Sequence, residues 1–136
     1  MQISARLRNT TTSHAVQVNT AGQAKPLATE GRAGGGSAVN GGEFLMLALA
    51  SCYCNDLYRE AVRLQIELTE VEVEASAEFD GIGLAARDIQ YRARLVSPAS
   101  PEQIEQLLAE TDAVAEVHNT LRASSMVRRL PWPDET

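Results

Sequence analysis

The two cysteines of this 136-residue chain stand two positions apart, at the end of the apolar run "NGGEFLMLALASCYCN" over residues 40–55. Such thiols could form a redox pair, bind a metal ion, or provide one reactive thiolate beside a structural neighbour. A helix points residues two apart in directions that differ by about 200°, which disfavours a Cys52–Cys54 disulfide. A metal site is disfavoured too, because the only histidines are His14 and His118. One reactive Cys52 or two buried structural thiols remain as alternatives.

The composition favours one globular domain over residues 1–136, with a core mainly of Leu, Val, Ile and Ala because only 4% of the residues are aromatic. A net charge of −6 argues against a nucleic-acid or anionic-membrane partner. No apolar run reaches the roughly 18 residues of a membrane span, and the first residues lack the apolar core of a signal peptide. We therefore expect a cytoplasmic protein with reduced thiols.

Cys52 must be positioned by a helix, which we predict from Glu43 to about Leu64. Its first half is apolar nearly all round, which predicts burial on every side. Beyond Asn55 the pattern becomes amphipathic, with one buried and one exposed face. The apolar first half comprises Phe44, Leu45, Leu47, Ala48 and Leu49, the later buried face Leu57, Ala61 and Leu64, and the exposed face Asp56, Arg59, Glu60 and Arg63.

Short strands and turns are predicted before this helix. The alternating segment "HAVQVNT" over residues 14–20 predicts a strand, and the following "AGQ" predicts a turn. The Gly-rich segment over residues 30–42 could hold a phosphate at the start of the helix, but it lacks the spacing of the known phosphate-binding motifs. An adaptable loop is the alternative that we favour.

Residues 67–80 and 88–96 predict an antiparallel hairpin, joined by a "DGIG" turn. The second strand carries Arg92 and Arg94 on the polar side, where they would face the glutamates of the first strand. Such a run of glutamates could bind a metal, but a solvated face paired with arginine is favoured. The residues expected on the buried side are Val71, Val73, Ala75, Ala77, Phe79, Ile89, Tyr91, Ala93 and Leu95.

The segment "SPEQIEQLLAE" over residues 100–110 carries a helix start, with Ser100 as N-cap, Pro101 at the first helical position and Gln103 as the capping-box partner. Its buried stripe would consist of Ile104, Leu107 and Leu108. A second short helix is predicted from Ala113 to Leu121, and "SSMVRRLPW" over residues 124–132 predicts a last strand. The sum is an α+β fold: N-terminal strands, a long buried central helix, a hairpin, two further helices and a final strand.

Two segments resemble the motifs of the OsmC/Ohr family, the osmotically induced and organic-hydroperoxide-resistance proteins. In the first family motif an Asn-Pro and a Glu open a buried helix that ends on the peroxidatic Cys, and Asn40, Glu43 and Cys52 match these positions. The segment "AVAEVHNTLRAS" resembles the second motif, in which a Cys-Pro leads into Ser-Asn-Thr-Leu. Its matching residues are Asn119, Thr120 and Leu121, and the resemblance extends from about Ser37 to Leu130.

The resemblance implies a hydroperoxide reductase on an OsmC-like fold that forms an intertwined homodimer. Cys52 would attack the peroxide as a thiolate, become a sulfenic acid, and be reset by a second Cys and a dithiol reductant. An arginine from the N-terminal strands, held by Glu43, would lower the pKa of the thiol. Arg8 and Arg32 are the candidates for this arginine. We expect no cofactor and no bound metal.

Several positions depart from the family pattern. Ala115 stands where the second Cys is expected, Gly41 where the Pro is expected, and Gly42 where the strict peroxidases have a Glu. A sulfenic acid on Cys52 would therefore need Cys54, a thiol of the neighbouring subunit or an external thiol reductant. The expected function is a one-cysteine hydroperoxide reductase.

Two alternatives remain beside the reductase. In the first, Cys52 only lines an apolar pocket of a non-catalytic protein that binds small apolar ligands. In the second, His118, which follows Ala115 by three positions, pairs with Cys52 and is oriented by Asn119, as in a thiol hydrolase. A half-exposed helical histidine without such a role is the other interpretation of His118.

Overall fold

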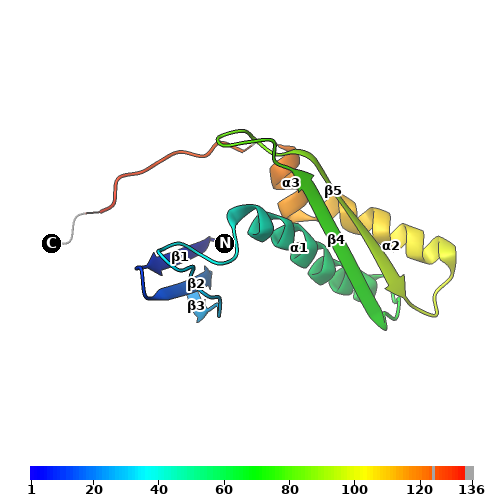
Figure 1. Ribbon diagram of the computed structural model, residues 1–136. Helices are drawn as coiled ribbons and strands as arrows, with labels where there is room; N and C mark the ends of the chain where they lie inside the picture. Colours follow the sequence, from blue (N-terminus) through cyan, green and yellow to red (C-terminus); the bar gives the residue numbers. More distant parts are fainter. Residues whose placement is uncertain (124, 134–136) are drawn as a thin grey trace. The chain divides into compact units, whose positions relative to one another are not determined.

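The computed structural model describes residues 1–123 and 125–133, and the chain divides into two compact units, residues 1–45 and 46–136 (Figure 1). The single domain predicted over residues 1–136 stays a prediction. In the described part of the chain, no helix combines the length and the apolar character that crossing a membrane requires.

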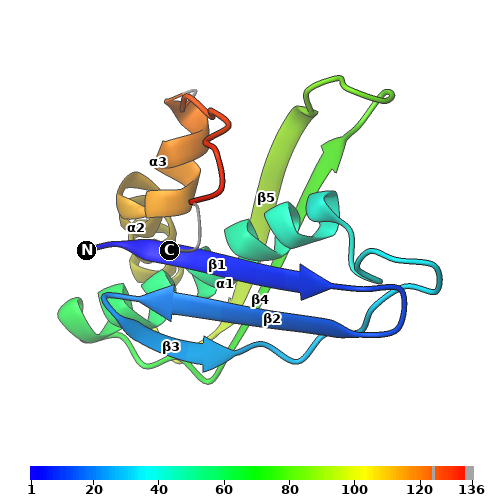
Figure 2. The same cartoon turned by 90° about the vertical axis from the view of Figure 1, so that its left-hand side faces the viewer.

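The N-terminal unit contains an antiparallel sheet of three strands in the order β1 (Ile3–Asn9), β2 (His14–Thr20) and β3 (Gln23–Pro26), seen from one face in Figure 2. The predicted strand and turn are therefore confirmed. Ala21 and Gly22 form the two-residue turn, and both have positive φ, as a type I′ hairpin requires. The Gly-rich segment that follows is irregular and contains only a bridge between Gly31 and Ser37.

The long helix α1 spans Gly41–Arg63, close to the predicted bounds. Oδ1 of the Asn40 side chain accepts a hydrogen bond from the backbone N–H of Glu43 at 2.8 Å. The backbone N–H of Asn40 in turn donates to Glu43 Oε1 at 3.0 Å. This reciprocal capping box fixes the start of the helix. The expectation of burial on every side was wrong, because Leu47 is 59% exposed. The core packs against one stripe of the helix: Leu49, Tyr53, Asp56, Leu57, Glu60 and Ala61.

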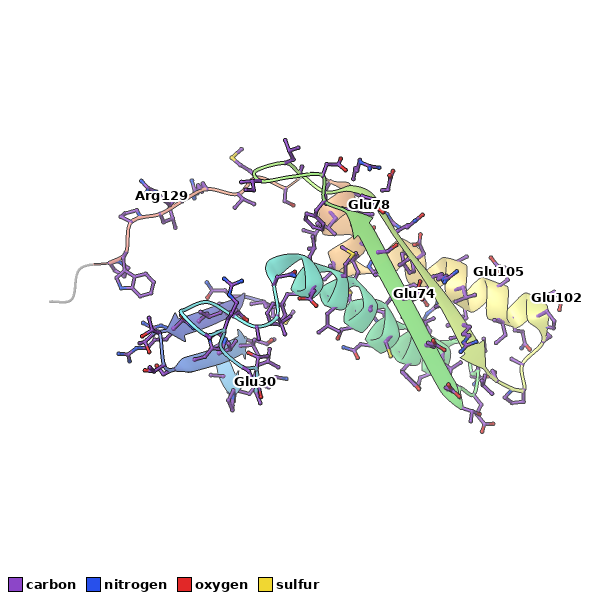
Figure 3. All side chains as sticks on the ribbon, in the orientation of Figure 1. Glu30, Glu74, Glu78, Glu102, Glu105 and Arg129 are labelled. Atoms are coloured by element: carbon purple, nitrogen blue, oxygen red, sulfur yellow. The ribbon has the colours of Figure 1, made fainter. Side chains whose placement is uncertain are left out.

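Strands β4 (Glu70–Glu78) and β5 (Arg87–Val96) form the predicted antiparallel hairpin. Glu72 pairs with Arg94 and Glu74 with Arg92, and each pair forms a salt bridge on the exposed side. Figure 3 labels Glu74 and Glu78 along β4. Phe79 and Ile89 were predicted on the buried side, and both predictions were wrong. Phe79 lies beyond the end of β4 and is exposed, and Ile89 near the start of β5 is 41% exposed.

Helices α2 (Pro101–Val114) and α3 (Glu116–Arg122) complete the unit. Ser100 and Gln103 form the predicted capping box, with Pro101 in the first turn. The second helix begins three residues later than predicted, because α2 continues to Val114 and the extended backbone of Ala115 separates the two helices. The helices lie on one face of the hairpin, around a core of Tyr53, Leu57, Ala61, Ile66, Leu107 and Ala115 (Figure 1).

The predicted final strand over residues 124–132 was wrong for residues 125–132, which adopt no regular secondary structure; Ser124 lies outside the described residues. A strand forms only where another strand's edge accepts its hydrogen bonds, and neither described sheet includes this segment. The α+β class is otherwise confirmed.

Candidate functional site

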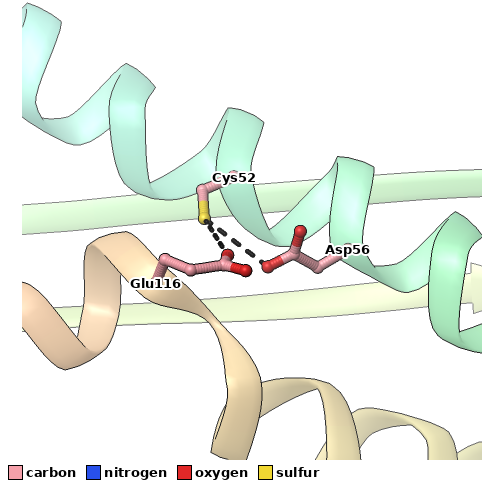
Figure 4. Close-up of side chains that lie close together, drawn as sticks. All are labelled: Cys52, Asp56 and Glu116. Atoms are coloured by element: carbon pink, nitrogen blue, oxygen red, sulfur yellow. Dashed lines mark hydrogen bonds between the residues drawn. The ribbon is translucent and has the colours of Figure 1, made fainter. Parts of the chain in front are cut away.

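The thiol of Cys52 lies beside two carboxylates. Its Sγ is 3.6 Å from Asp56 Oδ2 and 3.9 Å from Glu116 Oε2, and these contacts are drawn in Figure 4. The three side-chain atoms lie within 4.8 Å of one another. Because Cys52 is half-buried and Asp56 is only 6% exposed, the thiol meets this pair at the edge of the core.

Two local features bring these groups together. Cys52 and Asp56 are four positions apart on α1, so their side chains share one face of the helix. The break at Ala115 then places Glu116 in the first turn of α3, against that face. Arg59 binds the far oxygens of both acids, with Nη1 at 3.2 Å from Asp56 Oδ1 and 3.4 Å from Glu116 Oε1. The nearer oxygens stay directed at the sulfur.

The electrostatics of this site hold Cys52 in its protonated form. Burial raises the pKa of the Cys52 thiol, the negative charges of Asp56 and Glu116 raise it further, and the backbone of Val117 lowers it in part. The family resemblance implied a lowered pKa, so the structure differs from that expectation. The cation at the site contacts the carboxylates, and it compensates their charge rather than stabilising a thiolate.

Asp56 and Glu60 were predicted on the exposed face of α1, and this was wrong, because both are buried. Each acid is compensated by an arginine three positions along the sequence: Arg59 binds Asp56, and Arg63 binds Glu60 through Nε. Burial raises the pKa of the Asp56 carboxyl, the negative charge of Glu116 raises it further, and Arg59 lowers it in part. Asp56 is therefore a stronger proton acceptor than an ordinary aspartate.

His118 is buried, with 3% of its surface exposed, and not half-exposed as a surface helix would leave it. Its ring packs against Tyr91 and Tyr53, at centroid distances of 4.5 Å and 5.6 Å. Neither ring nitrogen has a hydrogen-bond partner, so His118 makes no hydrogen bond to Cys52. Asn119 does not orient the ring, because its amide donates to the Ala113 carbonyl at 3.1 Å. The pKa of His118 is lowered, chiefly by burial and then by Arg122.

The remaining predicted site residues lie in the N-terminal unit. Glu43 takes part in the capping box of α1, and Arg32 donates from Nε to the Gly35 carbonyl at 3.4 Å. The roles of Glu43, Arg8 and Arg32 toward the thiol stay predictions. Cys52 and Cys54 are both free thiols, as expected.

Sequence reasoning missed Asp56 and Glu116 as partners of the thiol. The spacing of four between Cys52 and Asp56 was a usable signal, whereas the position of Glu116 depends on where the second helix begins, which the sequence pattern placed three residues too early. One thiolate and two carboxylates are also ligand types that bind zinc. In this arrangement Arg59 already compensates the negative charge of the two carboxylates.

Comparisons with known proteins agree with the predicted fold. The family model described as "OsmC-like protein" matches residues 34–128. An OsmC-like protein from Mycoplasma pneumoniae has a similar structure, with a TM-score of 0.59 at 19% identity over 90% of this chain and 87% of that one. A search of curated proteins finds no match.

Two further similar structures carry functional descriptions. An OsmC-like hydroperoxide resistance protein from Jannaschia sp. CCS1 has a TM-score of 0.58 at 17% identity, over 98% of this chain and 93% of that one. An organic hydroperoxide resistance protein OsmC from Legionella pneumophila has a TM-score of 0.58 at 19% identity, over 90% of each chain. At these identities the likeness establishes the fold.

Proposed function

Since this chain belongs to the OsmC-like family, we propose that it reduces small organic hydroperoxides, with Cys52 as the nucleophile and Asp56 as its general base. The observation that carries this proposal is the contact of 3.6 Å between Cys52 Sγ and Asp56 Oδ2. A protonated thiol is a poor nucleophile, and an adjacent base overcomes this by taking the proton as the sulfur attacks.

The proposed step conserves atoms and electrons. The sulfur of Cys52 attacks the terminal oxygen of ROOH, the S–O bond forms as the O–O bond breaks, and the S–H proton passes to Asp56. Asp56 then protonates the leaving alkoxide, so the products are a sulfenic acid on Cys52 and the alcohol ROH. The two-electron oxidation of the thiol balances the reduction of the peroxide.

An external thiol completes the proposed cycle, because the second family cysteine is replaced by Ala115. Two equivalents of a small thiol would reduce the sulfenic acid to the free Cys52 thiol, with water and one disulfide as products. A cytoplasmic location is part of this proposal, since reduced thiols are abundant there. The hydroperoxide-resistance descriptions of two structural neighbours favour the same substrate class.

The test is mass spectrometry of the Cys54→Ser protein after dilute cumene hydroperoxide, with a Cys52→Ser control. We expect sulfenic acid on Cys52 and none in the control. Asp56→Asn should slow its formation at pH 7 by about a hundredfold or more, the range in which general bases act. Glu116→Gln keeps the base and should not slow it. A faster reaction in Asp56→Asn would show that this carboxylate only represses the thiol.

The raised pKa of Cys52 favours a second candidate from another class, a non-catalytic protein that binds small apolar ligands. In that case Cys52 stays reduced in dilute hydroperoxide and alkylates slowly in every variant. The thiol hydrolase is not supported, because both ring nitrogens of His118 lack a partner and the thiol instead contacts carboxylates.

A homodimer is part of the proposal, with α1 in the interface. Leu47, Tyr58 and Val62 are exposed and fall on one side of α1 by their spacing, and Val62 is 80% exposed. Exposed apolar side chains in such a row are typical of interfaces. Light scattering should give twice the mass of one chain, and Val62→Asp should lower it, whereas Ile82→Asp in the β4–β5 turn should not. A monomeric wild-type protein would contradict this assignment.

A further inference from the structure

A cavity of about 240 Å³ lies between α1, β5 and α3 within the C-terminal unit. Leu49, Ile89 and Leu121 give it apolar walls, and the ring of Tyr91 adds an aromatic one. Its polar lining comes from the remaining side chains, Gln90, His118 and Arg122. The cavity shares no lining residue with the cluster of Cys52, and the proposed peroxide chemistry does not use it.

His118 is the lining residue that points to a ligand in this cavity. A neutral imidazole has one N–H donor and one acceptor nitrogen, and here both nitrogens lack a partner although the ring is buried. Buried polar groups are nearly always hydrogen-bonded, so an orphaned pair calls for an explanation. The neighbouring hydroxyls are already engaged elsewhere: Tyr53 donates to the Leu108 carbonyl, and Tyr91 donates to Asp112.

The charges around the cavity favour an uncharged occupant. Burial and Arg122 hold His118 in its neutral form. The guanidinium of Arg122 is itself compensated, with Nη2 at 2.8 Å from Asp112 Oδ1 and Nη1 at 3.2 Å from Asn119 Oδ1. An anion would therefore find no uncompensated cation here, and a cation would meet the guanidinium.

We propose that this cavity binds a small uncharged molecule with an apolar body and one hydroxyl group, and that the hydroxyl pairs with His118. A hydroxyl can accept from the N–H of a neutral imidazole or donate to its other nitrogen, so one hydroxyl can pair with one of the two free nitrogens of His118. The apolar walls cover the body of the molecule, as in most small-molecule sites. Because the nitrogens are covered from solvent, a lining side chain must shift on binding, and we expect Ile89, which is 41% exposed, to be that side chain.

The test compares phenol with toluene, which has nearly the same shape but no hydroxyl. Each is titrated into the isotope-labelled full chain, and the ring nitrogens of His118 and the methyl groups of Leu49 and Leu121 are followed by NMR. We expect phenol to bind about tenfold more tightly, as one net hydrogen bond allows, and to shift the His118 nitrogens. Equal affinities, or shifts scattered outside the cavity, would overturn the proposal.

Four variants complete the test. His118→Phe keeps a ring but removes both nitrogens, so phenol should bind no better than toluene, whereas the matched His14→Phe change in the other unit should leave the preference intact. Ile89→Trp at the rim should fill the cavity and weaken both probes, and it decides the case if His118→Phe does not fold. Cys52→Ser should bind phenol normally, so failure of the peroxide chemistry and failure of this site are distinguishable. A preference for phenol that survives His118→Phe would contradict the proposal.

Discussion

The hydroxyl of Tyr53 donates to the backbone carbonyl of Leu108 at 2.7 Å, which links α1 to α2 inside the core. Tyr53 also packs its ring against Tyr91 of β5, at a centroid distance of 4.6 Å. One side chain therefore connects α1, α2 and β5, and it directly follows Cys52 in the sequence.

Tyr53→Phe should lower the free energy of unfolding by about 1 kcal/mol, since it removes one hydrogen bond and keeps the buried ring. Tyr58→Phe is the matched control, because Tyr58 lies on the same helix but is exposed. Urea unfolding followed by circular dichroism measures both. Equal effects in the two variants would mean that the Leu108 contact does not stabilise the fold.

Glu116→Gln should lower the pKa of Cys52, because it removes one of the negative charges that raise it. The rate of iodoacetamide alkylation as a function of pH, in the Cys54→Ser background, reports this change. Alkylation near pH 8 should be faster than in the parent protein. Glu110→Gln, at a carboxylate that binds Arg63 instead, should leave the profile unchanged.

Asp112 makes the stability of the C-terminal unit depend on pH in the acidic range. The hydrogen bond from Tyr91 and the nearby Arg122 lower its pKa from the ordinary value of 3.8. A carboxyl whose pKa is lower in the folded state than in the unfolded chain stabilises the fold at pH values above its unfolded-state pKa. This contribution is lost as the pH falls through the folded-state pKa. Asp112→Asn should therefore cost about 1 kcal/mol at pH 7, and the difference from wild type should shrink below pH 3.8.

Urea unfolding at several pH values tests this dependence, with Glu105→Gln on the exposed side of α2 as a control. A constant difference between Asp112→Asn and wild type down to pH 2 would argue against the ionised carboxylate as the stabilising group.

Ser100→Ala should destabilise the protein by about 1 kcal/mol, because the capping box of α2 loses the bond to the Gln103 amide. Ser51→Ala is the matched change at an exposed serine inside α1, where alanine has the better helix propensity, and it should not destabilise. Thermal unfolding distinguishes the two variants. A Ser100→Ala protein as stable as wild type would exclude the capping bond as a stabilising contact.

The local elements were predictable from sequence because their causes are local. The capping box at Ser100 and the alternation of Val71 and Val73 lie within a few residues, and the Glu72–Arg94 pair follows from the hairpin register. The final strand failed because strand propensity does not supply a partner edge.

The site was only partly predictable. Cys52 could be singled out by its motif, but the burial of Asp56 depends on its compensation by Arg59 and on the packing of α3. Charged residues in an amphipathic pattern normally lie in solvent, so the pattern alone gives the wrong side for such an acid. The burial of His118 likewise follows from the break at Ala115, which sets the rotation of α3.

Ala115 itself limits how this chain could acquire a cysteine at the second position of the family motif. Its side chain is 0% exposed and belongs to the core cluster with Tyr53 and Leu107. A sulfur added there would enter a filled space, and overpacking a core typically costs about 1–3 kcal/mol. A cysteine at this position would therefore be tolerated better after one neighbouring side chain had become smaller. In that sense the packing around Ala115 keeps this position free of a thiol.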